Sequence, residues 1–274
     1  MSHDALVRLL ESRDLDGVRA VIGAQPGLLH EAFPQNLAPE DLGRGQAGNT
    51  PLHLAAYFGG RAIMKYLIGK GASLDARNAE HRTPSHVALE HNFEAIKDLE
   101  QLGIEKDHIH AACRHDHERL REILLTEPDS ASDMSTGLSV LGWATYYGAK
   151  ESAEILFEHG AQPCGRELHC AAGIANPDFG ALLIDRGADV NEADGDGATP
   201  LHVAVAHQYS SDATDFVRLL LERGADREIQ ATARPLTPLQ HARERLAKQQ
   251  KAGIEAGRPR WKNFAGVIAL LERD

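Results

Sequence analysis

The sequence has few aromatic residues, few cysteines and a shortage of basic charge, and each shortage excludes a class of protein. Aromatic residues make up 5% of the chain, so its core must consist mainly of aliphatic side chains. Cys113, Cys164 and Cys170 form no CxxC pair, which argues against a disulfide framework and predicts free thiols in a reducing, cytoplasmic location. The net charge of −11 disfavours nucleic acid as a general partner, because binding to phosphates needs a basic face.

Long apolar runs and catalytic signature motifs are missing as well. No apolar stretch approaches the length of a membrane span, and the amino terminus lacks the basic start and apolar run of a signal peptide. The chain contains no Walker A, GxGxxG, GxSxG or HExxH motif. We therefore expect no membrane partner, no cofactor and no resident metal, and a non-catalytic role is favoured over an enzyme.

What the sequence does contain is a repeated phrase. The tetrapeptide Thr-Pro-Leu-His at 50–53 returns with one change at 83–86 and unchanged at 199–202, and the first two copies begin 33 residues apart. Self-similarity at this period is typical of stacked repeat proteins. Residues 50–75 and 199–226 resemble ankyrin repeats almost position for position. The resemblance implies an all-α solenoid of helix-turn-helix units joined by β-hairpin loops, with about eight helical pairs.

The histidine of this phrase marks equivalent positions along the chain. These positions are His53, His86, His110, Gly142, His169, His202 and Gln240. They divide a single repeat domain (1–274) into an N-terminal capping unit (1–30), a connecting loop (31–47), six repeats (48–79, 80–106, 107–134, 135–164, 165–194 and 195–230) and a C-terminal capping unit (231–274) with an insertion at about 247–262. Helices are expected at 5–12 and 16–22 in the first unit and at 264–271 in the last.

Two connections between repeats are short. From Gly103 to His110, and from Gly160 to His169, there is too little chain for the hairpin that usually precedes an ankyrin repeat. The helices can still stack, but the row of loops should have open notches before the fourth and sixth helical pairs.

The resemblance also indicates which residues meet a partner. In the ankyrin pattern, the two residues after the Ala-Ala of each first helix lie on the concave side. Tyr and Arg, which dominate binding hot spots, are frequent at these positions. The predicted partner-binding residues are Tyr57, Phe58, Glu90, His91, Arg114, His115, Tyr146, Tyr147 and His207.

Other polar residues have structural interpretations. The histidines of the repeated phrase are expected to bridge to the backbone of a neighbouring loop, as the family resemblance implies. The sequence Asp194-Gly-Asp196 begins like a calcium loop, but no closing glutamate follows, so it is interpreted as a turn. His91 and His115 hold equivalent positions on adjacent units and fit either a polar binding surface or a shared metal.

Two functions follow from these observations. The first is a non-catalytic scaffold that binds a protein partner, of unknown identity, through its concave groove. The alternative is a small-molecule or metal-dependent catalytic site in the central repeats. In that alternative, His91 or His115 acts as general base or metal ligand, and Arg114 binds an anionic group of the small molecule. Tyr146 or Tyr147 forms one side of the site. Self-association through the insertion at 247–262 is a third possibility.

Overall fold

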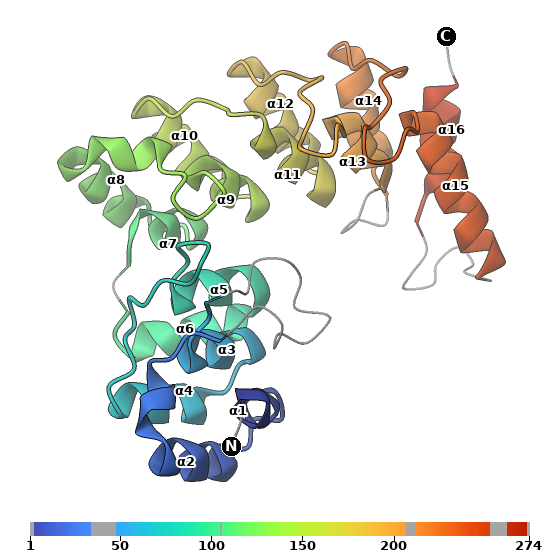
Figure 1. Ribbon diagram of the computed structural model, residues 1–274. Helices are drawn as coiled ribbons and strands as arrows, with labels where there is room; N and C mark the ends of the chain where they lie inside the picture. Colours follow the sequence, from blue (N-terminus) through green and yellow to red (C-terminus); the bar gives the residue numbers. More distant parts are fainter. Residues whose placement is uncertain (1–2, 34–47, 105, 207–211, 253–261, 273–274) are drawn as a thin grey trace. The chain divides into compact units, whose positions relative to one another are not determined.

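The computed structural model describes residues 3–33, 48–104, 106–206, 212–252 and 262–272, without the side chain of residue 93. This part of the chain contains sixteen α-helices and no residue in a β-strand, which confirms the predicted all-α fold and its eight helical pairs (Figure 1). The pairs are α1 (His3–Glu11) with α2 (Leu15–Ala24), α3 (Pro51–Phe58) with α4 (Arg61–Gly69), α5 (Pro84–His91) with α6 (Phe93–Gln101), α7 (His108–Cys113) with α8 (His117–Thr126), α9 (Val140–Tyr146) with α10 (Lys150–Glu158), α11 (Arg166–Ile174) with α12 (Pro177–Asp185), α13 (Pro200–Ala206) with α14 (Thr214–Glu222), and α15 (Pro238–Lys251) with α16 (Phe264–Leu271).

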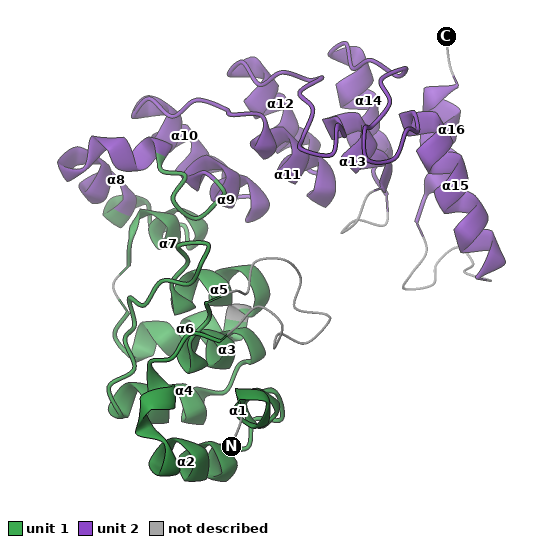
Figure 2. Ribbon diagram, viewed as in Figure 1, with its two compact units in different colours: residues 1–119, 133–138 green, residues 120–132, 139–274 purple. Residues whose placement is uncertain are grey.

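The helices form two compact units (Figure 2). Unit 1 contains residues 1–119 and 133–138, and unit 2 contains residues 120–132 and 139–274. In unit 1, the first helices α1, α3, α5 and α7 pack side by side, and the second helices α2, α4 and α6 form a parallel row. In unit 2, α9, α11, α13 and α15 form one row, and α12, α14 and α16 form the other. Each unit is therefore a stack of helical pairs, whereas the assignment of residues 1–274 to a single domain stays a prediction.

The repeated phrase explains where the first helices begin. Thr50 is the N-cap of α3 and Pro51 is its first residue, a position where the missing N–H of proline costs no hydrogen bond. The side chain of His53 accepts a hydrogen bond from the backbone N–H of Thr50, and this contact completes a capping box. In α15, Gln240 replaces the histidine and accepts the equivalent bond from Thr237 at 2.9 Å.

Small apolar residues fill the interface between neighbouring first helices. Leu52, Ala55 and Ala56 of α3 are buried. On α4, Ile63 and Leu67 are buried as well. The same small residues allow close approach of the helices, which is how a stack with so few aromatic residues obtains a continuous core.

Tyr66 departs from the pattern of its buried neighbours. It follows Ile63 by three positions, the spacing of an apolar stripe on a helix, but its side chain is only partly buried. Arg19 and Lys70 lie over its ring, with their cationic atoms 5.7 and 5.8 Å from the ring centroid. Tyr66 therefore belongs to the outer edge of the stripe, between the core and solvent.

A left-handed residue forms the tip of four loops, two positions before the helix N-cap. Its φ is +77° at Gly48, +58° at His81, +77° at Gly137 and +72° at Gly197. Glycine adopts this conformation without a steric penalty, whereas a side chain costs about 1–2 kcal/mol. His81 is the exception in this set and carries that strain.

Substitutions at two of these tips should have opposite effects. We expect Gly197→Ala to lower the free energy of unfolding by about 2 kcal/mol. The added Cβ would lie 2.6 Å from the backbone nitrogen of Thr232, which is too close. In addition, alanine would have to adopt the left-handed conformation of Gly197. His81→Gly should leave stability unchanged or raise it by up to about 1 kcal/mol, because the steric strain is relieved. Urea unfolding followed by circular dichroism measures both, and equal losses in the two variants would contradict the assignment of strain to His81.

The remaining segments can be compared with their predictions. The connections from α6 to α7 and from α10 to α11 are short, as predicted. The Asp194 turn is confirmed, because the Asp194 carboxylate accepts hydrogen bonds from the N–H groups of Asp196 and Ala198, both at 2.9 Å. Helix α15 continues to Lys251, so residues 247–251 of the predicted insertion are helical, while most of its remainder lies outside the described residues.

Candidate functional site

Three histidines of the repeated phrase are structural, as predicted. The backbone N–H of Thr50 donates to His53 Nδ1 at 3.1 Å, so Nε2 carries the ring proton and donates to the carbonyl oxygen of Arg82 at 2.9 Å. Burial lowers the pKa of His53 to about 4, against the opposing effect of that backbone hydrogen bond, so the ring is neutral near pH 7. His169 Nε2 and His202 Nε2 reach carbonyl oxygens of the next loop in the same way, at 2.9 and 3.0 Å.

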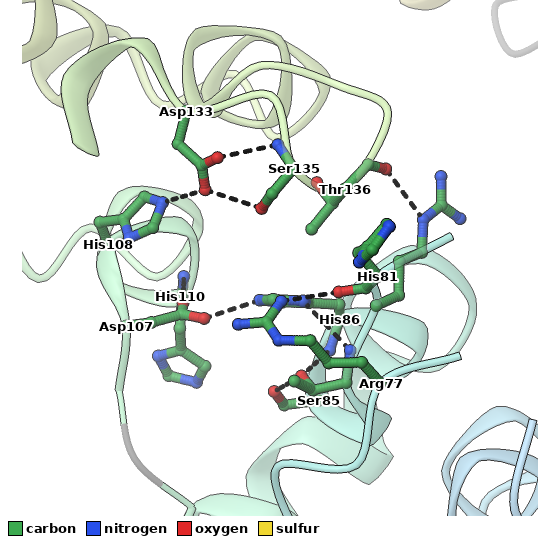
Figure 3. Close-up of polar contacts among 12 residues, drawn as sticks. Arg77, His81, Ser85, His86, Asp107, His108, His110, Asp133, Ser135 and Thr136 are labelled. Atoms are coloured by element: carbon green, nitrogen blue, oxygen red, sulfur yellow. Dashed lines mark hydrogen bonds and ion pairs between the residues drawn. The ribbon is translucent and has the colours of Figure 1, made fainter. Parts of the chain in front are cut away.

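His86 makes a different contact, and its predicted bridge to loop backbone is wrong. Its Nε2 lies 2.8 Å from the carboxylate of Asp107, which is the N-cap residue of α7 (Figure 3). The short connection before α7 supplies this side chain instead of a backbone carbonyl. Burial acts to raise the pKa of Asp107, but the hydrogen bond and charge of His86, together with the N–H of His110, outweigh burial and lower the pKa to about 2.

A loop covers the position where the sequence predicts an open notch before the fourth helical pair. Asp133 accepts a hydrogen bond from His108 at 2.8 Å, and the side chain of Arg82 donates to the carbonyl oxygen of Thr136 at 3.3 Å (Figure 3). Thr136 is completely buried. Residues 133–138 thus join the start of α7 to the loop before α5 within unit 1. The expectation of an open notch before the fourth helical pair is therefore wrong.

His110 is the second exception among the repeat histidines. Its side chain is 1% exposed, and among the described residues neither ring nitrogen has a hydrogen-bond partner. Its Nε2 lies 3.2 Å from Glu100 Oε1, too poorly aligned for a hydrogen bond. Burial lowers the pKa of His110, with Glu100 acting in the opposite direction. The ring is therefore a buried neutral group that fills space between α6 and α7.

The pair of Asp107 and His86 predicts a specific loss of stability in acid. The folded-state pKa of Asp107 is depressed from 3.8 to about 2, so its contribution is fully present above pH 4 and is lost as the pH falls towards 2. Because the Asp107 side chain is one-third exposed, we expect the contribution to be about 1–2 kcal/mol rather than the full value of the shift. Asp107→Asn should flatten the dependence of the free energy of unfolding on pH between 4 and 2.

Denaturant unfolding at several pH values in that window tests this expectation. Asp129→Asn, at an exposed aspartate, is the matched control and should keep the slope of the wild type. If Asp107→Asn shows the same slope as the wild type, the contact between Asp107 and His86 does not stabilise the fold.

In unit 2, a buried glutamate takes over the bridging role where the repeat histidine is replaced by Gly142. Glu167, near the start of α11, is completely buried. Its carboxylate accepts hydrogen bonds from the hydroxyl of Ser139, the N-cap residue of α9, and from the N–H and S–H of Cys164, at 2.8 and 3.0 Å for the last two. One side chain therefore joins two repeats across the second short connection.

Four of the predicted partner-binding residues contact one another in unit 1. The ring centroids of Tyr57 and Phe58 are 5.1 Å apart, and those of Tyr57 and His91 are 4.7 Å apart. His91 Nε2 lies 3.3 Å from the carboxylate of Glu90, which is also paired with Arg82. We call Tyr57, Phe58, Glu90 and His91 the Tyr57–His91 cluster.

The cluster is charged and partly open to solvent. The side chains of Glu90 and His91 are 31% and 30% exposed. Burial acts to raise the pKa of Glu90, but the hydrogen bond from His91 and the charge of Arg82 lower it overall. Glu90 is therefore ionised near pH 7, next to two aromatic rings and an imidazole.

The other two predicted residues of unit 1 make separate contacts. Arg114 Nε donates to Glu100 at 3.0 Å. His115 occupies the turn between α7 and α8 with φ at +56°, and its ring centroid lies 6.0 Å from that of His117. Among the described residues, no group of three or more His, Cys, Asp or Glu side chains could hold a metal ion, so the metal shared by His91 and His115 receives no support.

The predicted residues of unit 2 form a second aromatic pair. Tyr146 is the last residue of α9 and Tyr147 is its C-cap, and their ring centroids are 5.6 Å apart. Both side chains are partly exposed. His207 lies outside the described residues.

The thiols are poor nucleophiles near pH 7. Burial raises the pKa of Cys113 well above its usual value. Partial burial, followed by the hydrogen bond and charge of Glu167, raises the pKa of Cys164 to about 11, and burial raises that of Cys170 to about 12. A thiolate is the reactive form of cysteine, so none of the three is activated for covalent chemistry.

Sequence reasoning missed a cavity of about 270 Å³ in unit 2. It lies between α13 with the loop before it and the loop that leads into α15, and it is lined by Asp196, Ala198, His202, Val203, Ala206, Ala231, Ala233, Arg234, Leu236 and His241. Its walls come from segments about 30 residues apart, and only the stacking of two loops brings them together. Of the lining residues, the sequence draws attention to Asp196 and His202, and it assigns a structural role to both.

Comparison with known proteins identifies the architecture. A family model described as ankyrin repeats in three copies matches residues 14–109 and 164–233, which is more than half of the chain. The chain belongs to the ankyrin repeat family. Ankyrin repeats generally bind protein partners. The unmatched residues between the two segments include the Asp133 loop and Gly142, where this chain departs from the repeated phrase.

Its relatives are much longer ankyrin repeat proteins. Rabankyrin-5 from Mus musculus is 33% identical over 187 residues, which cover 65% of this chain and 14% of that protein. The p105 subunit of nuclear factor NF-kappa-B from Gallus gallus is 26% identical over 210 residues, covering 67% of this chain and 21% of that protein. The chain thus spans about a fifth or less of the length of these relatives. Within the described residues, none of the helices is long and apolar enough to cross a membrane.

Proposed function

We propose that this ankyrin repeat protein is a non-catalytic module that binds a partner protein through the first-helix ends of successive repeats. The observation that carries the proposal is the Tyr57–His91 cluster. Two adjacent repeats supply aromatic rings in contact with each other, a partly exposed imidazole and an ionised carboxylate. Such amphipathic side chains, held rigidly by the helices behind them, lose little conformational freedom on binding.

The contacts around the cluster support a binding surface that is already in place. Arg82 holds Glu90 from one side and the backbone of Thr136 from the other. The side chain of Arg13 donates to the carbonyl oxygen of Phe58 at 2.6 Å. A partner would therefore meet side chains whose positions are fixed before it arrives.

Tyr146 and Tyr147 extend the proposal to unit 2, where they supply the same kind of surface. The free cysteines, none of which forms a disulfide in the described residues, support a cytoplasmic location as part of this proposal.

Affinity capture from a lysate of the native host, followed by mass spectrometry, tests the proposal. The wild-type chain should recover a defined partner that Tyr146→Ala/Tyr147→Ala recovers less well. Leu125→Ala, which removes an exposed apolar side chain outside the predicted positions, is the control and should recover the partner as the wild type does. Equal recovery by all three proteins would count against a role for the tyrosine pair.

A further inference from the structure

A hollow on the second helices of unit 1 differs in chemistry from the rest of this acidic chain. It has a volume of about 460 Å³ and lies between α2 and α4. Its apolar part comes from Leu15, Ala62 and Gly69. Its polar part comes from Tyr66 and three basic residues, Arg19, Lys65 and Lys70. We call Arg19, Lys65, Tyr66 and Lys70 the Tyr66 surface.

The ring of Tyr66 organises two of the positive charges. The guanidinium carbon of Arg19 lies 5.7 Å from the ring centroid, and the ammonium nitrogen of Lys70 lies 5.8 Å from it. An aromatic face attracts cations at this distance, so it holds charges from two helices beside the same hollow. A Cβ built on Gly69 would meet no atom within 4 Å outside its own stretch of helix, so the surface beside the ring is open at this position.

These charges are less neutralised than those of two arginines elsewhere in the rows of second helices. Arg61 of α4 pairs with Asp98 of α6 at 2.8 Å, and Arg223, the C-cap residue of α14, pairs with Asp185 of α12 at 2.7 Å. On the Tyr66 surface, the one ion pair of Arg19 within the described residues is with Asp16, whose side chain is 91% exposed and lies 3.3 Å away.

Among the described residues, Lys65 and Lys70 take part in no ion pair. A chain of net charge −11 therefore presents three cations around one half-buried aromatic ring.

We propose that the Tyr66 surface binds a short acidic segment of a partner protein, separately from the Tyr57–His91 cluster. Carboxylates of the segment pair with Lys65 and Lys70, and an apolar side chain between them contacts Leu15 and Ala62. The hollow is bounded by two helices and carries only three cations. The net negative charge of the whole chain repels long polyanions such as duplex nucleic acid or an anionic membrane, whereas a short peptide interacts mainly with the local surface.

Fluorescence anisotropy with the full chain tests this proposal. The probe is a short fluorescein-labelled peptide of glutamates around one leucine. The wild type should bind it at low ionic strength, and binding should weaken with added salt. Lys65→Glu/Lys70→Glu should weaken binding by roughly tenfold or more, since two attractive charges become repulsive. Tyr66→Ala should weaken it as well.

Reversing the charge of two lysines elsewhere on the chain distinguishes binding at the Tyr66 surface from a general effect of net charge. Lys248→Glu/Lys251→Glu changes the net charge by the same amount on exposed positions of α15 and should alter the affinity by less than about twofold. Tyr57→Ala/His91→Ala should leave peptide binding unchanged, which keeps this test independent of the proposed function. No binding by the wild type, or equal losses in the two lysine variants, would overturn the proposal. Binding of duplex DNA or phosphatidylserine vesicles through Lys65 and Lys70, without binding of the peptide, would also overturn it.

Discussion

Replacing Glu167 with alanine is expected to lower the free energy of unfolding by about 3 kcal/mol. The carboxylate is completely buried and accepts hydrogen bonds from the Ser139 hydroxyl and from the N–H and S–H of Cys164. Alanine leaves these donors without their acceptor and creates a void at the junction of α9 and α11. The repeat histidine, which bridges neighbouring units at His53, His169 and His202, is replaced by Gly142 here.

Two further variants sharpen the test. Glu167→Gln keeps the shape and one acceptor oxygen, so it should lose less, about 1–2 kcal/mol. Glu158→Ala removes an exposed glutamate from the end of α10 and should change stability by less than about 0.5 kcal/mol. Urea unfolding followed by circular dichroism gives all three values. A Glu167→Ala variant as stable as Glu158→Ala would show that the buried carboxylate does not hold the two repeats together.

Combined replacement of Tyr57 and His91 with alanine is expected to weaken binding of the captured partner by about 30-fold or more. The two rings are in contact across adjacent repeats, with centroids 4.7 Å apart. Each single variant removes part of a shared surface, so the two losses should not add. A double-mutant cycle measured by calorimetry should show a coupling energy of at least about 0.5 kcal/mol.

Phe157→Ala is the matched control for this cycle. Phe157 is also a partly exposed aromatic residue, and it stacks against Arg186 on the second helices of unit 2. It lies outside the predicted binding positions, so its replacement should leave the affinity unchanged. A larger loss from Phe157→Ala than from the double variant would move the binding surface away from the Tyr57–His91 cluster.

The helices could be predicted from the sequence because their signals are local. Thr-Pro at the start of α3, α5, α13 and α15, the apolar spacing of Ile63 and Leu67, and the match of α16 to the predicted 264–271 all depend on residues within a few positions of each other. The structural role of His53 followed from the repeated phrase in the same way.

The corrections arise where residues from distant segments meet. Nothing in the neighbourhood of His86 indicates that Asp107, 21 positions later, replaces a backbone carbonyl, and nothing near the short connection shows that residues 133–138 cover it. Glu167 looks like an ordinary acidic residue at a helix start, yet it is completely buried because Ser139 and Cys164 supply its hydrogen bonds. Tyr66 has the spacing of a core residue, but its ring faces two cations. The spacing of apolar residues predicts which face of a helix is buried. Only the structure of the stack shows where on that face burial ends.

Hydrogen–deuterium exchange of the chain with and without its captured partner tests the central claim most directly. Peptides that contain Tyr57, Phe58, Glu90 and His91 should exchange more slowly in the complex, while those covering α12 and α14 should be unchanged. Protection confined to the second helices, with no change around Tyr57 and His91, would contradict the proposal that the first-helix ends bind the partner.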